Sequence, residues 1–256
     1  MATPQAAKAE YERTAALYEL IPDIPLGVIE SQLLTHVFGD ATGLTVLDLG
    51  GGSGNHAREA VDAGAALVDI VDISPDMLQH ARDAEVALGR DDRVRCFEAD
   101  CSQPFDLPLR EKQYDIVMAN WLFDHAGTDE MLEGMWHNVA TYLKPGGRFV
   151  GVRLERPFGD STHLEKYGVT LKDFKELPGG VSLTVCINGG NGVPFQIQIA
   201  SREVSYNGST VLHEKYGLKD VYAVPYEHAD IVARDLPFWD EFLQNPFSVV
   251  ITGTKA

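Results

Sequence analysis

One stretch decides the fold of this chain: Val46-Leu47-Asp48-Leu49-Gly50-Gly51-Gly52-Ser53-Gly54-Asn55. An apolar run with an acidic residue near its end leads into a glycine-rich turn, and a helical pattern begins at His56. This pattern indicates a β-strand whose carboxyl end opens into a loop where a ligand can touch bare backbone. We therefore expect an α/β protein that binds a small molecule at this loop.

The spacing of the glycines argues against a dinucleotide. The dinucleotide fingerprint needs glycines at the first, third and sixth positions of the turn. Counted from Gly50, the sixth position is Asn55, and Gly54 comes one residue early. Asp48, two residues before the loop, would repel a pyrophosphate and suits a cationic ligand. A P-loop is also excluded, because no Lys-Ser or Lys-Thr pair follows the glycines.

An acidic residue followed by Gly-x-Gly-x-Gly is the first motif of the class I S-adenosylmethionine-dependent methyltransferases, and residues 48–54 resemble it. The next expected strand, Ala66 to Ile73, ends in Asp72. A helix then begins with Ser74 as its N-cap and Pro75 at its first helical position. Asp72 lies 22 residues after Gly50, about where such folds place the carboxylate that binds the ribose.

Three further landmarks follow in the order that this family shows. The third strand, Arg93 to Ala99, ends in Asp100 and Cys101. The fourth, Tyr114 to Asn120, runs into Trp121. A helical face over residues 132–143 then stops at a Lys-Pro-Gly-Gly turn before a fifth strand over 148–154. The resemblance covers residues 43–154.

The resemblance implies a Rossmann-like, doubly wound α/β fold, with a mostly parallel seven-stranded sheet and an antiparallel last strand near residues 246–253. It implies S-adenosyl-L-methionine as the cofactor, with ribose hydroxyls on Asp72 and the adenine amino group on Asp100. Asp72 could instead cap the following helix, and Asp100 could be an ordinary loop carboxylate. The expected cofactor-binding residues are Tyr11, Asp48, Gly50, Gly52, Asp72, Ile73, Met77, Asp100, Cys101, Asn120 and Trp121.

We expect residues 1–256 to form one methyltransferase domain. Its parts would be an N-terminal helical cover over 1–42, a cofactor-binding core over 43–154, and a substrate-cover insertion with the final strands over 155–256. Tyr11, Ala15 and Tyr18 loosely match a segment that folds over the cofactor in small-molecule methyltransferases, although an amphipathic packing helix explains them equally well. Two strands over 181–187 and 195–206 would form a β-hairpin insertion.

Composition restricts the partners. The 256 residues include 38 Asp plus Glu against 21 Lys plus Arg, which gives a formal net charge of −17. Such a balance opposes a nucleic acid substrate, whose phosphates require Lys and Arg. We expect neither a membrane span nor a secretion signal, and three cysteines without paired spacing favour a cytoplasmic location. No metal site is expected, because His, Cys and carboxylates are not grouped at ligand spacing.

The loop after the fourth strand narrows the substrate. It reads Asn120-Trp121-Leu122-Phe123 and lacks the two prolines found in enzymes that methylate adenine or glutamine amides. His125, just past this strand, could act as a general base, or it could be a hydrogen-bonded residue at a helix start. Arg153 could hold a substrate carboxylate or pair with Glu155. The expected substrate-binding residues are Tyr18, Phe123, His125, Arg153 and Tyr167.

The function predicted from the sequence is methyl transfer from S-adenosylmethionine to a small organic molecule, with O- or N-methylation in secondary metabolism favoured. One alternative is a protein with the methyltransferase fold that binds the cofactor without transferring its methyl group, because fold alone does not settle function. A nicotinamide-dependent oxidoreductase is the other alternative, and the missing sixth-position glycine disfavours it.

Overall fold

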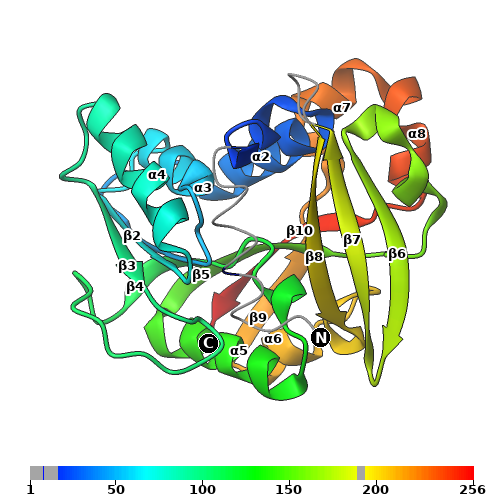
Figure 1. The fold of residues 1–256 in the computed structure, drawn as a ribbon. Helices are drawn as coiled ribbons and strands as arrows, with labels where there is room; N and C mark the ends of the chain where they lie inside the picture. Colours follow the sequence, from blue (N-terminus) through cyan, green and yellow to red (C-terminus); the bar gives the residue numbers. More distant parts are fainter. Residues whose placement is uncertain (1–7, 9–16, 189–193) are drawn as a thin grey trace.

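The main sheet of the protein has seven strands. The computed structural model describes residues 8, 17–188 and 194–256. The strand order is β3-β2-β1-β4-β5-β10-β9 (Figure 1). The strands are β1 (Thr45–Leu49), β2 (Leu67–Asp72), β3 (Val94–Glu98), β4 (Tyr114–Met118), β5 (Leu143–Leu154), β9 (Leu218–Ala223) and β10 (Ser248–Lys255). The strands β1 to β5 pair in parallel, whereas β10 runs antiparallel to both β5 and β9. The predicted fold class is confirmed.

Helices cover both faces of this sheet. On one face lie α2 (Pro25–Phe38), α3 (Asn55–Asp62) and α4 (Pro75–Ala87), and on the other lie α5 (Asp129–Tyr142) and α6 (Val211–Lys215) (Figure 1). Two more helices, α7 (Asp230–Arg234) and α8 (Leu236–Gln244), pack beside α2 and the turn η3. The 3₁₀ turns are η1 (Ile21–Asp23), η2 (Phe123–His125), η3 (Asp160–His163), η4 (Glu165–Tyr167), η5 (Glu203–Ser205) and η6 (Tyr226–His228). No helix in the described ranges has both the length and the apolar character that crossing a membrane requires.

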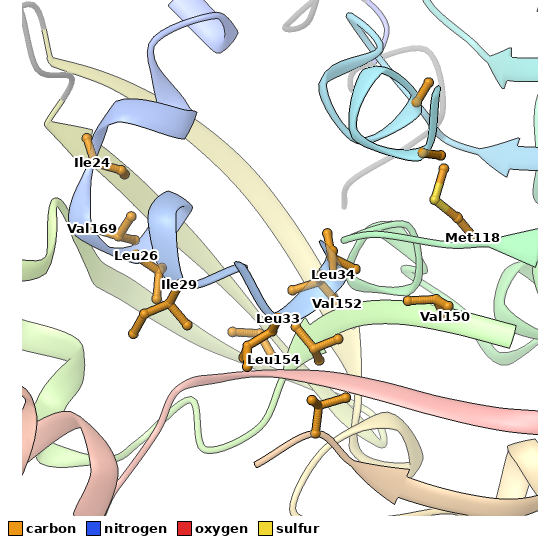
Figure 2. Close-up of a cluster of buried hydrophobic side chains, with 14 of the residues drawn as sticks. Ile24, Leu26, Ile29, Leu33, Leu34, Met118, Val150, Val152, Leu154 and Val169 are labelled. Carbon is orange, nitrogen blue, oxygen red and sulfur yellow. The ribbon is translucent and has the colours of Figure 1, made fainter. Parts of the chain in front are cut away.

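Helix α2 begins with Pro25 in its first turn, where the missing N–H of proline costs nothing. Its buried face packs on β5, and Figure 2 shows Leu33 and Leu34 beside Val152 and Leu154. The buried positions recur at helical spacing and are Leu26, Gly27, Ile29, Glu30, Leu33, Leu34 and Phe38. Glu30 is the carboxyl group on this face, and burying it costs free energy unless it is hydrogen-bonded.

The opposite face of the sheet is covered by the helix that the sequence predicted after the fourth strand. The hydroxyl of Thr128 caps α5 by accepting a hydrogen bond from the Met131 N–H at 3.3 Å. The Trp136 ring stacks on Phe123, with ring centroids 4.4 Å apart, and tilts against Phe149 at 5.2 Å. These rings lie in the apolar cluster between α5 and this face of the sheet.

A separate antiparallel sheet stands beside the main one (Figure 1, yellow). It consists of β6 (Val169–Leu177), β7 (Gly180–Asn188) and β8 (Pro194–Arg202). The sequence predicted the last two as a hairpin, whose turn at 189–193 lies outside the described residues. It did not predict β6. In this strand Asp173 has a φ of 54°, and the register shifts between Lys172 and Lys175, so the alternation of apolar and polar residues is broken.

Candidate functional site

A cavity lies at the carboxyl ends of β1, β2 and β4, where the main sheet, α2 and the three-stranded sheet meet. This is the edge at which open α/β sheets bind ligands. One side is made by the glycine loop and the residues after β2, β3 and β4. The other is made by η1, α2 and aliphatic side chains of β6, β7 and β8.

Backbone hydrogen bonds hold the glycine loop in a fixed shape. The N–H of Gly50 donates to the Val71 carbonyl at 2.7 Å, and the N–H of Gly52 donates to Asp72 Oδ2 at 2.9 Å. Both glycines have positive φ, 70° and 54°. A side chain at Gly52 would be strained there, and its Cβ would lie 3.1 Å from Met77 Cε. The loop therefore exposes bare backbone to the cavity.

Asp72 connects the loop to the next helix. Its Oδ1 accepts the Ser74 N–H at 2.9 Å, and the Ser74 hydroxyl caps α4 by accepting the Met77 N–H at 3.3 Å. Burial raises the pKa of the Asp72 carboxyl group, although the backbone N–H groups of Ser74, Gly52 and Ile73 oppose that rise. The carboxyl group accepts hydrogen bonds from the backbone and also lines the cavity. The two predicted roles of Asp72, ribose binding and support of the helix start, are therefore compatible.

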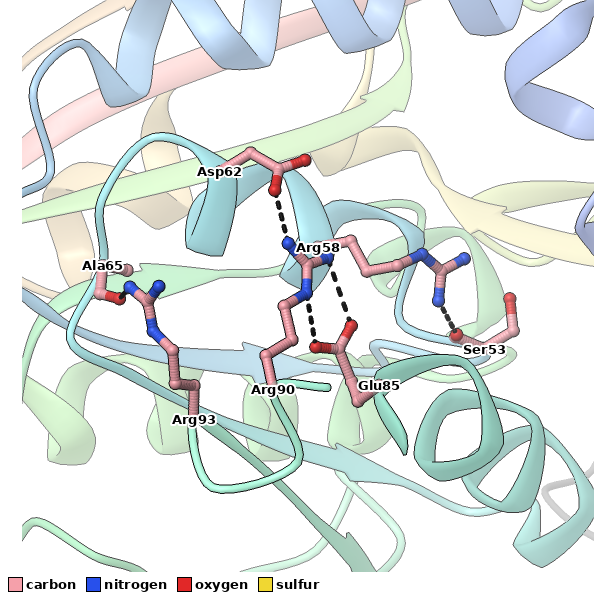
Figure 3. A network of polar contacts seen from close by, with 7 residues as sticks. All are labelled: Ser53, Arg58, Asp62, Ala65, Glu85, Arg90 and Arg93. Carbon is pink, nitrogen blue, oxygen red and sulfur yellow. Dashed lines mark hydrogen bonds and ion pairs between the residues drawn. The ribbon is translucent and has the colours of Figure 1, made fainter. Parts of the chain in front are cut away.

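The first turn of α3 ties the N-terminal segment to the loop. Arg58 donates to the Ser53 carbonyl at 2.8 Å (Figure 3) and pairs with Glu19 at 2.8 Å. Figure 3 also shows Arg90 bound to Glu85 and Asp62, which braces the turn after α4 against the end of α3. The contacts of Arg58 hold the glycine loop and the N-terminal segment, whereas those of Arg90 join residues that do not line the cavity.

The residue before α3 binds the segment in a second way. The Asn55 side-chain amide donates to the Tyr18 carbonyl at 3.2 Å. Tyr18 lines the cavity, and its ring centroid lies 5.5 Å from that of Phe195 in β8. The segment around Tyr18 thus lies between the glycine loop and the three-stranded sheet.

Most of the predicted cofactor residues line the cavity: Gly50, Gly52, Asp72, Ile73, Met77, Asp100, Cys101, Asn120 and Trp121. Tyr11 lies outside the described residues. Asp48 is buried beneath the loop rather than in the lining, and a Cβ on Gly51 would come within 2.6 Å of its carboxyl carbon. Burial raises the pKa of Asp48 to about 7. Its place is consistent with supporting the loop from below.

His125, the predicted base, belongs to η2 and lines the cavity. Burial lowers its pKa to about 4, because an imidazolium ion loses its hydration there. The ring is neutral at pH 7. A neutral imidazole can accept a proton, but one with this pKa is a weak base.

Three of the predicted substrate-binding residues, Phe123, Tyr167 and Arg153, are not in the described lining of the cavity. Phe123 is 2% exposed and stacked in the α5 core. Tyr167 is fully buried, stacks on Trp239 at 5.1 Å and donates its hydroxyl to the Phe238 carbonyl.

Arg153 is 2% exposed and is bonded within the fold. It pairs with Glu155 at 3.1 Å and donates to backbone carbonyls of Leu154 and Ser205. The alternative reading of Arg153, an ion pair with Glu155, is the one that the structure supports. Among the described residues that line the cavity there is no lysine or arginine.

Four titratable residues in the cavity wall were not predicted from the sequence: Glu30, His56, Glu59 and Asp124. Glu30 is 4% exposed, and its Oε2 accepts the Trp121 indole N–H at 3.1 Å. Burial raises the Glu30 pKa to about 7 against the opposing effects of Trp121, His56 and Ser248. Glu30 could have been found as the one charged position within the apolar stripe of α2.

His56 and Glu59 form an ion pair of 3.0 Å on the first turns of α3. Burial alone would lower the His56 pKa, but the charges of Glu59, Asp48 and Glu30 outweigh it and raise the pKa to about 9. The His56 side chain keeps 25% exposure in a wall of the cavity. At neutral pH it is therefore a cation that faces carboxyl groups.

Part of this chain is similar to a known protein family. Residues 46–147 match the family described as "Methyltransferase domain". The chain is 30% identical over 149 residues to a demethylmenaquinone methyltransferase from Tropheryma whipplei, a match that covers 57% of this chain and 55% of that protein. The chain therefore spans about half the length of this curated relative.

Two solved structures share the fold over nearly the whole chain. An S-adenosylmethionine-dependent methyltransferase from Clostridium acetobutylicum has a TM-score of 0.60 at 15% identity, covering 96% of this chain and 99% of that one. The CcbJ methyltransferase from Streptomyces caelestis has a TM-score of 0.58 at 21% identity, covering 91% of each. The family match over residues 46–147 and the shared fold confirm the predicted resemblance to the class I S-adenosylmethionine-dependent methyltransferases.

Proposed function

We propose that this chain is an enzyme that transfers a methyl group from S-adenosyl-L-methionine to a small organic molecule. The observation that carries this proposal is the glycine loop, whose Gly52 N–H is held on Asp72 while bare backbone faces the cavity. A loop of this shape lets a bulky ligand approach the main chain closely.

The lining fits the proposed cofactor by its chemistry. Asp72 and Asp100 are hydrogen-bond acceptors for ribose hydroxyls and an adenine amino group, and Ile73 and Met77 offer apolar contact to the base. Carboxyl groups without lysine or arginine in the described lining suit a sulfonium cation and oppose a pyrophosphate. The cofactor would supply a methyl group attached to a positively charged sulfur.

The protein's own work in such a reaction is alignment and exclusion of water. Helix α2, the segment around Tyr18 and the three-stranded sheet enclose the acceptor side of the cavity. We infer that the acceptor is small, because the net charge of −17 repels a nucleic acid. We further propose that the reaction is an O- or N-methylation that takes place in the cytoplasm as part of secondary metabolism.

Calorimetric titration of the pure protein with S-adenosylmethionine, and separately with NAD, tests cofactor choice. We expect saturable binding of the first compound only. A screen of small acceptors with isotope-labelled cofactor and mass detection then tests transfer. Binding without transfer to any acceptor would favour the alternative of a cofactor-binding protein, and binding of NAD alone would overturn the proposal.

A further inference from the structure

The acceptor side of the cavity combines an aliphatic wall with the buried carboxyl group of Glu30. The three-stranded sheet contributes Val169, Leu171, Val185, Ile197 and Ile199. Glu30 faces the same cavity from α2. Apolar surroundings of this kind favour an apolar ligand and strengthen any hydrogen bond made inside them.

Only one of the two carboxyl oxygens of Glu30 accepts a hydrogen bond of good geometry from the described residues. Oε2 accepts the Trp121 indole N–H at 3.1 Å, whereas Oε1 is buried and makes no hydrogen bond of good geometry with the described residues, although Ser248 lies beside the carboxyl group. A buried acceptor of this kind costs free energy unless a ligand satisfies it. Trp121 follows directly on Asn120 at the end of β4, and both line the cavity.

Trp121 is held in an unusual backbone conformation at this point. Its φ is 59°, a region that non-glycine residues seldom adopt, and its N–H donates to the Val152 carbonyl at 2.7 Å. The conformation lets the indole reach Glu30 on α2. The carboxyl group is thus fixed beside Trp121, next to the end of β4 that lines the cavity.

We propose that the methyl acceptor is an apolar compound bearing a hydroxyl group, and that Glu30 is the catalytic residue that binds this hydroxyl and takes its proton at Oε1. This inference rests on the proposed methyl transfer. The acceptor oxygen forms a bond to the methyl carbon while the carbon–sulfur bond breaks and sulfur keeps its electron pair. The O–H proton passes to the carboxylate, so the sulfonium charge and the carboxylate charge disappear together.

The groups around Glu30 are arranged to suit this role. His56 and Glu59 face it from α3, and Ser248 faces it from β10. Burial raises the pKa of the Tyr226 hydroxyl, and the charge of Glu30 adds to that rise. His56 is the cation of this set and favours the ionised carboxylate. Since the described lining has no lysine or arginine, an acceptor that carries a phosphate or carboxylate is disfavoured.

Binding of two neutral probes, without cofactor, tests the inference. 2-Naphthol has a hydroxyl group, whereas 2-methoxynaphthalene has the same apolar rings and no donor. We expect the wild type to bind 2-naphthol about 10-fold to 100-fold more tightly in calorimetry at pH 8, because a hydrogen bond to a carboxylate is a strong one. The preference should shrink several-fold at pH 6, where Glu30 is protonated.

In Glu30→Gln we expect the preference for the hydroxyl to disappear. The amide oxygen would be used by the Trp121 N–H, which places an amide donor at the position of Oε1, and a donor cannot distinguish a hydroxyl from an ether oxygen. Glu85→Gln is the matched control, because Glu85 is a 3% exposed helical carboxylate that pairs with Arg90 and does not line the cavity.

An equal preference in wild type and Glu30→Gln would overturn the inference, as would the absence of saturable 2-naphthol binding. The comparison of wild type at pH 6 and pH 8 needs no variant, so it decides the matter even when Glu30→Gln is unfolded. A separate titration with S-adenosylmethionine distinguishes a failure of this inference from a failure of the proposed function. Cofactor binding without a hydroxyl preference rejects Glu30 alone, whereas failure of cofactor binding rejects the proposed function.

Discussion

A single carboxyl group, that of Asp72, joins the glycine loop to α4. We expect Asp72→Ala to weaken S-adenosylmethionine binding by about tenfold to a hundredfold, because charged hydrogen bonds contribute ~1.5–3 kcal/mol each. The structure adds that Gly52 and Ser74 also lose their acceptor, so the melting temperature should fall as well. Calorimetry and thermal melting measure the two effects, and unchanged cofactor affinity in a folded variant would contradict the assignment.

His125 should contribute little to proton transfer. Its pKa of about 4 means that the ring is already neutral across the physiological range, so its titration would shape the rate only near pH 4. We expect His125→Gln to retain the cofactor affinity of the wild type and to lose less than about tenfold in turnover. A rate that rises with pH through about 7 in both proteins would point to Glu30. Loss of that limb in His125→Gln would instead restore His125 as the base.

Buried His213 makes stability depend on pH. It is 3% exposed, lies against Trp136 and Phe149, and has a pKa lowered to about 3 by burial and by Arg153. The unfolded chain binds a proton near pH 6.5 that the folded chain refuses, so stability falls as pH drops through that value.

At pH 5, compared with pH 7.5, this one group should cost about 2 kcal/mol. We expect His213→Phe to remove that part of the acid sensitivity in urea unfolding measured at the two pH values. The same replacement at exposed His137 is the control. An identical pH dependence in wild type and His213→Phe would contradict the assignment.

At the scale of elements, the junction of η1 and α2 depends on a close backbone approach. A Cβ on Gly27 would lie 2.0 Å from the Ile21 carbonyl oxygen, so Gly27→Ala must displace η1 or α2. Because both elements line the cavity, we expect lower thermal stability and weaker 2-naphthol binding. Thr35→Ala, at an exposed position of the same helix, should leave both properties unchanged. Unaltered probe binding in Gly27→Ala would show that this wall does not shape the acceptor site.

The elements that the sequence predicted well carry local signals. Glycines fix the turn after β1, and the Ser74 cap followed by Pro75 fixes the start of α4, so these features need no tertiary information. Strand β6 was missed because its outer face is charged and Asp173 interrupts the alternation. Fold class follows from the order of such signals, which is why it could be predicted.

The site was harder to predict, because spacing along a chain does not say where a side chain points. Phe123 follows the correct strand, yet η2 turns its ring into the α5 core. Glu30 lies in an N-terminal helix far from the glycine motif, and only folding brings it to Trp121. The predicted cofactor residues close to the loop do line the cavity, whereas the proposed acceptor side depends on packing between distant segments.

At the scale of the whole molecule, two sheets share the cavity. The residues after β1, β2 and β4 line the proposed cofactor side, and β6 to β8 line the proposed acceptor side. We expect Ile197→Ala to weaken 2-naphthol binding while leaving S-adenosylmethionine affinity unchanged, since its side chain faces the cavity from β8. Gln196→Ala, at the exposed neighbouring position, is the control. Equal losses for both ligands would indicate general unfolding, which circular dichroism would detect.

The separateness of the three-stranded sheet has a consequence for how this protein can evolve. Residues 169–202 form one continuous insertion that shares no strand with the seven-stranded sheet. Its inward positions alternate with exposed ones from Pro194 to Ile199 of β8, so each of these can be exchanged without altering the solvent face. Recombination that replaces this block would give descendants a new acceptor while they inherit the cofactor loop intact. Selection can thus diversify the chemistry of the lineage through a single segment of the gene.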